Sequence, residues 1–211
     1  MLAVLTVDQQ DSRSRGDGVP ALLSLLEDAV EARSLPAPLR AFERTVGDEV
    51  QAVVDDPATT VELVGTLLRA QGWWIGLGVG EAEHPLPADT RAGRGPAYVL
   101  AREAVTRAKT SPHRIAVVGA DRYRAKHLET VLGLWAGLLE RRTERGWQVH
   151  DLVREGLSYD EAGRRLGISQ SAVSQRAAAA SLVDERRARS LAQDLLGEML
   201  GVEPGTAKEE P

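Results

Sequence analysis

The strongest structural signal in the chain is the stretch from residue 157 to residue 176, which reads LSYDEAGRRLGISQSAVSQR. Ser158 and Glu161 have the spacing of a capping box, in which the serine hydroxyl accepts a hydrogen bond from a free backbone N–H and the glutamate reaches back to the serine. Gly167 permits a tight turn, and Ser169 is a residue type that begins helices. The stretch therefore predicts two short helices that pack at a steep angle.

The second of these two helices is expected to expose a polar face. The stretch resembles the helix-turn-helix of sigma-factor region four and of many bacterial regulators. This resemblance implies that the second helix enters the major groove of double-stranded DNA, where glutamine suits adenine and arginine neutralises phosphate. The residues expected at this interface are Arg164, Arg165, Ser169, Gln170, Ser171, Ser174, Gln175 and Arg176. The alternative is a helical hairpin that contacts another protein.

Helical patterns continue on both sides of this motif. Apolar residues recur at three-four spacing over residues 128–139 and again over 188–199, which indicates amphipathic helices. We expect a connecting helix at 121–146, a helix-turn-helix domain at 147–200 and a mobile tail at 201–211. A single helix-turn-helix seldom makes enough contacts, and both apolar faces need a partner. We therefore also expect a homodimer.

The first 120 residues alternate between strand-like and helix-like patterns instead. Apolar runs between turn residues predict strands, and amphipathic stretches that open at Asp56-Pro57 and at Pro96 predict helices. The order β-α-β-β-α-β-α-β predicts one sheet covered by helices, and hence an α+β domain at 1–120. Gly76 and Gly78, inside a predicted strand, indicate that a phosphate or a helix approaches the backbone closely.

Two acidic residues lie where predicted strands end or turn. Asp8 follows the first strand, and Gly47-Asp48-Glu49 joins two strands in a predicted hairpin. If these strands are neighbours, both aspartates emerge at one edge of the sheet. Paired carboxylates can hold Mg²⁺ against a triphosphate. The alternative is an ordinary hairpin turn beside a solvated strand end.

Three segments in this half resemble class III nucleotidyl cyclases and GGDEF domains. They are Val46–Val53, Gly76–Glu81 and Gly95–Arg102, and they occur in the order of that family. Together with the helix-turn-helix behind them, they resemble the SatD family over most of the chain. The resemblance implies a ferredoxin-like, nucleotidyl-cyclase-type sheet domain. It implies Asp8 and Asp48 as metal ligands, with Gly47, Glu49, Gly95, Tyr98 and Arg102 at a ligand site.

The same resemblance bears on whether the chain is an enzyme. Cyclases carry an asparagine and, four residues later, an arginine that stabilise the transition state. If Arg102 is that arginine, Tyr98 stands where the asparagine belongs. This favours a nucleotide-binding domain without catalysis over an active, metal-dependent nucleotidyl-transfer enzyme, which stays as the alternative.

Composition excludes several classes of function. The absence of cysteine rules out disulfides, a thiolate nucleophile and zinc sites built on sulfur. Aromatic residues make up only 4% of the chain, which disfavours stacking platforms for single-stranded nucleic acid. No apolar run approaches the roughly 18 residues of a membrane span. Residues 1–7 lack a basic leader and resemble a strand more than a signal peptide, so we expect a cytoplasmic protein.

The charge distribution divides the chain as the motifs do. Residues 1–90 carry a net charge of −9, whereas 91–140 carry +5 and 141–190 carry +3. Such asymmetry suggests different partners for the two halves. The sequence therefore predicts a transcriptional regulator that binds double-stranded DNA and senses a nucleotide or related phosphorylated ligand, with Mg²⁺ as the expected cofactor.

Overall fold

The computed structural model describes residues 1–202, and the side chains of all of these except Arg13 and Arg15. The α+β class predicted from the sequence is confirmed. The chain divides into a sheet unit, formed by residues 1–133 together with the chain from Leu191 onward, and a helical unit, Leu134–Ser190. Most of the predicted tail at 201–211 lies outside the described residues.

The described residues of the sheet unit form one five-stranded sheet with the order β2-β3-β1-β4-β5. Pairing is antiparallel from β2 through β4, and β5 is parallel to β4. Up to β4 the chain follows the β-α-β-β-α-β order of ferredoxin-like domains, with β1 between β3 and β4. The strands are β1 (Leu2–Gln9), β2 (Arg40–Arg44), β3 (Glu49–Val54), β4 (Trp73–Gly80) and β5 (Ile115–Gly119).

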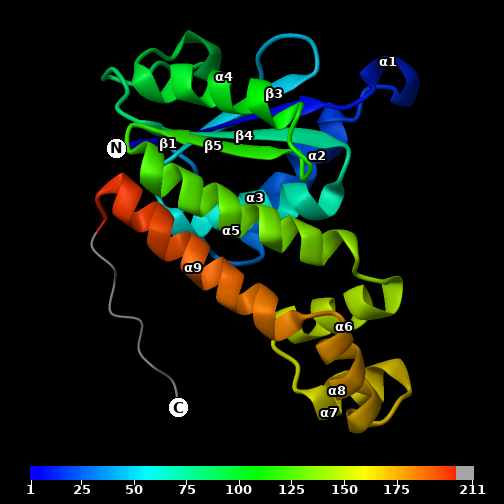
Figure 1. Cartoon of the computed structure of the whole chain (residues 1–211). Helices are drawn as coiled ribbons and strands as arrows, with labels where there is room; N and C mark the ends of the chain where they lie inside the picture. The colour runs from blue at the N-terminus through cyan, green and yellow to red at the C-terminus, as the bar shows by residue number, and fades with distance from the viewer. Residues whose placement is uncertain (203–211) are drawn as a thin grey trace. The chain divides into compact units, whose positions relative to one another are not determined.

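Helices cover both faces of this sheet (Figure 1). α2 (Val19–Glu31) and α3 (Pro57–Ala70) lie on one face, and α4 (Pro96–Ala108) lies on the other. Asp56 begins α3 as the sequence predicted, because its carboxylate accepts a hydrogen bond of 2.7 Å from the backbone N–H of Thr59. A short helix, α1 (Ser12–Arg15), follows β1, and a 3-10 turn, η1 (Thr90–Ala92), precedes α4.

The glycines of β4 allow α4 to pack directly on the strand. A Cβ atom added at Gly78 would lie 2.2 Å from the backbone nitrogen of Ala101, and one at Gly76 would lie 2.3 Å from that of Val105. Of the two partners predicted for these glycines, the helix is therefore the one observed. Their role is structural, because any side chain here would push α4 off the sheet.

Three helices of the helical unit pack around a small apolar core. They are α6 (Glu144–Arg154), α7 (Tyr159–Leu166) and α8 (Gln170–Ala179). The fully buried side chains of this core are Val149, Ala162, Val173 and Ala177. Two longer helices, α5 (Arg122–Glu140) and α9 (Leu182–Leu200), each contribute residues to both units.

The helix boundaries of this region differ from the predicted ones. The connecting helix expected at 121–146 ends at Glu140, because Thr143 accepts a hydrogen bond from the N–H of Gly146 and begins α6. The expected domain 147–200 also loses its last ten residues to the sheet unit. There the amino terminus donates a hydrogen bond of 3.1 Å to the carbonyl of Leu200.

Candidate nucleic-acid interface and ligand groove

The turn between α7 and α8 has the predicted caps. The backbone N–H of Glu161 donates to the hydroxyl of Ser158, and the Ser158 N–H donates to the Glu161 carboxylate at 2.8 Å. The hydrogen bond from the Ser158 hydroxyl holds the pKa of Glu161 below its usual range. Gly167 has a φ of 67° and ends α7 in the left-handed conformation that favours glycine.

The core fixes which face of α8 meets solvent. Val173 and Ala177 point into the core, and Gly163 of α7 comes so close that an added Cβ would lie 2.8 Å from the carbonyl oxygen of Ile168. Four polar side chains of α8 are exposed, as the sequence predicted, and Ser171 and Gln175 lie opposite the buried pair. The four are Gln170, Ser171, Ser174 and Gln175.

The predicted basic and capping residues of this motif differ in whether their side chains are free to contact DNA. Arg164 is exposed but forms an ion pair with Asp160 one turn earlier. Arg165 is exposed and Arg176 is half-buried, and neither has an ion-pair partner within residues 1–202. The Ser169 hydroxyl accepts a hydrogen bond of 3.2 Å from the N–H of Ala172, so this side chain is committed to the cap of α8.

A buried charged network, not predicted from the sequence, supports the helices behind this motif. The Arg142 side chain is fully buried and lies 2.6 Å from the carboxylate of Glu185, which is only 6% exposed. The same guanidinium donates to the carbonyl of Ala180 and lies 4.5 Å from the ring centroid of Trp147. His150 Nε2 approaches the other Glu185 oxygen at 3.3 Å.

The network favours ionised Glu185. Burial opposes ionisation of this carboxyl, but the hydrogen bond and charge of His150 and the charge of Arg142 outweigh the burial. Together they lower the pKa of Glu185 to about 2. Glu185 therefore ties α9 to α6 and to the loop before α6 as a carboxylate.

In the sheet unit, the structure brings Asp8 and the hairpin to the same edge of the sheet. Asp8 lies directly opposite Glu49 in the β1–β3 ladder, and Asp48 is in the adjoining turn. The Asp8 side chain is only 15% exposed and forms an ion pair with Lys109, the residue that ends α4. Lys109 thus occupies the place next to Asp8 that a cation would need.

These carboxylates do not form a prepared magnesium site as they stand. Within the described part of the chain, no cluster of three or more histidine or acidic side chains is placed to hold a metal. The residues present therefore fit Mg²⁺ poorly, because the best-placed carboxylate is already neutralised by an ammonium group.

Three other residues predicted at a ligand site have structural roles in the hairpin or at the start of α4. Gly47 has a φ of 63° at the hairpin tip. Glu49 accepts a hydrogen bond of 2.6 Å from the hydroxyl of Thr45. Gly95 has a φ of 113° before α4, and an added Cβ would lie 2.8 Å from the Cα of Ala82.

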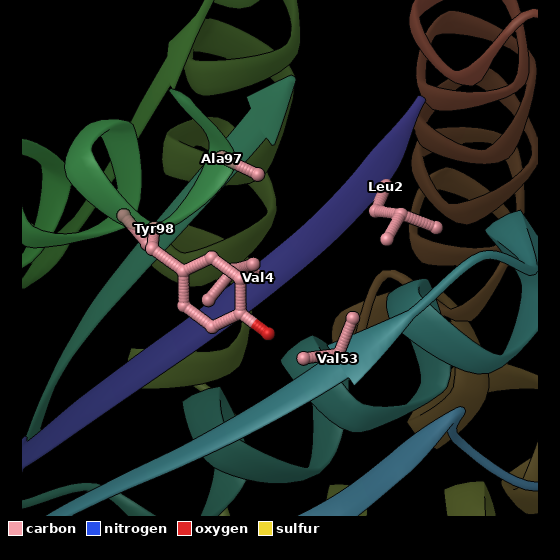
Figure 2. Packing of buried hydrophobic residues seen from close by; sticks show 6 residues of the cluster. Leu2, Val4, Val53, Ala97 and Tyr98 are labelled. Atoms are coloured by element: carbon pink, nitrogen blue, oxygen red, sulfur yellow. The ribbon is translucent and has the colours of Figure 1, made fainter. Parts of the chain in front are cut away.

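Tyr98 is a core residue. Figure 2 shows its ring extending from α4 across Val4 toward Val53. The hydroxyl is buried and has no hydrogen-bond partner among the described residues, and burial raises the pKa of Tyr98. Gly93 lies against the ring, since a Cβ there would be 2.0 Å from Tyr98 Cζ. A ligand that binds beside Tyr98 could therefore contact its ring but not its hydroxyl.

Arg102 lies in a groove between α4 and the β2–β3 hairpin. This groove, hereafter the α4 groove, has a volume of about 570 Å³. Its lining consists of Thr45, Val46, Gln51, Arg91, Gly93, Tyr98, Val99, Arg102, Glu103, Thr106 and Arg107. Most of these residues were not predicted. Val99, Glu103 and Thr106 follow the three-four spacing of an exposed helix face, but nothing in the sequence pairs that face with the hairpin.

Comparisons with known proteins found no match for this chain. No protein-family model matches the chain, and neither a curated protein nor a solved structure matches it. The resemblance to the SatD family and to nucleotidyl cyclases therefore stays a prediction. No helix within residues 1–202 is both long and apolar enough to cross a membrane.

Proposed function

We propose that this protein is a transcriptional regulator that binds double-stranded DNA through α7 and α8. The observation that carries the proposal is the exposed polar face of α8, which stands opposite the buried Val173 and Ala177 behind a capped turn. A helix presented in this way fits the major groove. Since the proposed binding partner is genomic DNA, we also propose that the protein is cytoplasmic.

In this proposal the exposed residues contact different parts of the DNA. Gln170 and Gln175 contact base edges, where a carboxamide makes paired hydrogen bonds to adenine. Arg165 contacts phosphate, because its guanidinium is exposed and has no ion-pair partner in the described chain. Ser169 contributes by capping α8, so its effect on DNA is exerted through the position of the helix.

We further propose that the sheet unit senses a nucleotide or a related phosphorylated ligand. The α4 groove, with Arg102 on its wall, supports this part of the proposal. An active nucleotidyl-transfer enzyme is the second candidate. Two placements weigh against it: Asp8 is paired with Lys109, and the Tyr98 hydroxyl is buried in the core.

Selection of duplexes from a random library, followed by titration of the selected sequence, tests DNA binding. We expect one sequence to bind far more tightly than scrambled DNA, and Arg165→Ala to weaken binding to both. Equal affinity for all duplexes would remove the regulator proposal. Absence of any binding would favour the helical hairpin as a protein-contact module.

A further inference from the structure

The α4 groove differs chemically from the metal-bridged site that the cyclase resemblance implies. We propose that it binds a phosphorylated ligand with an apolar body, such as a nucleotide, through arginine side chains and without a divalent cation. This inference rests on the proposed sensing role of the sheet unit, and it specifies how that site recognises its ligand.

The first observation is the charge of the groove wall. Arg91, Arg102 and Arg107 line it, and Glu103 is the acidic residue of the lining. Arg91 lies 3.9 Å from Asp89 and Arg107 lies 2.9 Å from Glu129, so both of these arginines already have an acidic partner. Arg102 is exposed, and within residues 1–202 its guanidinium has no ion-pair partner. An arginine in this state is free to bind a phosphate with two parallel hydrogen bonds.

The acidic groups nearby are already engaged with other cations. Glu103 lies 3.6 Å from Arg122, and Glu129 lies 2.9 Å from Arg107. Asp8 is not part of the groove lining and is paired with Lys109. Mg²⁺ bound to a phosphate generally needs one or two free carboxylates from the protein. The groove offers Arg102 in their place, the one arginine of its lining without an acidic partner in residues 1–202.

The second observation is the apolar part of the lining. Val46 at the hairpin tip is 78% exposed, and Val99 on α4 is 69% exposed, and both line the groove beside the Tyr98 ring. Thr45, Gln51 and Thr106 add polar groups that can orient a ligand. The volume lies in the range of about 300–1,000 Å³ typical of small-molecule sites. A nucleotide, in which a sugar joins the phosphate to a flat, partly apolar base, satisfies both parts of this lining.

Isothermal titration of the full chain with AMP, GMP and ATP tests the inference. Each nucleotide is measured with Mg²⁺ and again with EDTA. We expect at least one to bind, with a Kd that EDTA changes by less than about threefold. Arg102→Gln should weaken that binding about tenfold or more, since it removes a charge-assisted contact. The matched control is Arg69→Gln on α3, which covers the opposite face of the sheet and should leave the Kd unchanged.

The contrary outcomes separate this inference from the sensing proposal. Binding that requires Mg²⁺ and is lost in Asp8→Asn would overturn the inference and leave the sensing role in place. If Arg102→Gln leaves nucleotide binding unchanged, the nucleotide binds to another surface. That result would also overturn the inference and leave the sensing role in place. If no nucleotide binds to protein that is folded by circular dichroism, both the inference and the sensing role fall, and DNA binding is untouched.

Discussion

At the scale of single residues, Gln175 is the side chain best placed to carry base specificity. It is exposed near the middle of the α8 face that points away from Val173. Gln175→Ala should lower affinity for the selected duplex by about 1–3 kcal/mol, because it removes a paired contact to a base, and should leave scrambled DNA unaffected. Fluorescence anisotropy on both duplexes measures this. Gln148→Ala, at an exposed glutamine of α6, is the matched control and should change neither affinity.

Glu185 predicts how the helical unit responds to acid. Its folded pKa of about 2 lies below the ordinary value of 4.5, so folding favours the ionised form. The resulting stability is present above pH 4.5, is lost as the pH falls toward 2, and amounts to roughly 3 kcal/mol. Glu185→Gln should remove this pH dependence and cost about 3–5 kcal/mol at pH 7, because Arg142 stays buried without its partner.

Amide hydrogen exchange of α6 and α8, measured between pH 3 and pH 7, checks both effects of Glu185→Gln. Asp184→Asn changes the adjacent, exposed carboxylate and should leave exchange in these helices unaltered. Equal protection of wild type and Glu185→Gln across this pH range would show that the buried pair contributes nothing to stability.

The site residues that could be predicted are those whose environment is local. The exposure of Gln175 follows from helical periodicity, and the Ser158–Glu161 cap follows from spacing. The pairing of Asp8 with Lys109 joins residues about a hundred positions apart, so no local pattern contains it. The burial of Tyr98 escaped prediction for the same reason, since its neighbours come from β1, β3 and the loop before α4.

At the scale of secondary-structure elements, the contact of β4 with α4 determines how one face of the sheet is covered. Gly78→Ala would place a Cβ 2.2 Å from the Ala101 backbone, where no side-chain rotation can relieve the overlap. We expect a loss of more than about 2 kcal/mol in unfolding free energy. Gly133→Ala in α5 meets its nearest atom at an ordinary 3.5 Å and should stabilise the chain by up to about 1 kcal/mol.

Urea unfolding of both glycine variants, followed by far-UV circular dichroism, measures this contrast. A Gly78→Ala variant as stable as wild type would mean that α4 can move off the strand at little cost. The packing described for β4 and α4 would then be looser than the close approach indicates.

Elements were predictable where the sequence carries its own boundary signal. Pro96 begins α4 and Asp56 caps α3, as expected from their positions. The pairing of β1 with both β3 and β4 depends on contacts between distant segments, so the local patterns gave the strands but not their full order. The boundary before α6 was placed too late, at residue 147, because Thr143, the cap of α6, was assigned to the connecting helix.

At the scale of the whole molecule, the proposed regulator needs a connection between its DNA-binding helices and its ligand groove. Both α5 and α9 contribute residues to the sheet unit and to the helical unit, so the chain passes between the two units twice, each time within a helix. A ligand that changes the conformation of the sheet unit therefore has two continuous helices through which to act. If the proposed ligand changes the affinity for DNA, linkage requires DNA to change the affinity for the ligand by the same factor.

The proposed DNA complex should contain two copies of the chain. One α8 helix offers four exposed polar side chains, and a single helix-turn-helix covers too little DNA to be both tight and specific. We therefore expect two chains to bind an inverted repeat whose half-sites lie about 10–10.5 base pairs apart, or a multiple of that spacing. Sedimentation velocity on labelled duplexes should find two chains per full site. A half-site duplex should bind at least about 100-fold more weakly, because it loses the contacts of the second copy. A monomer that binds one half-site with full affinity would contradict the dimer.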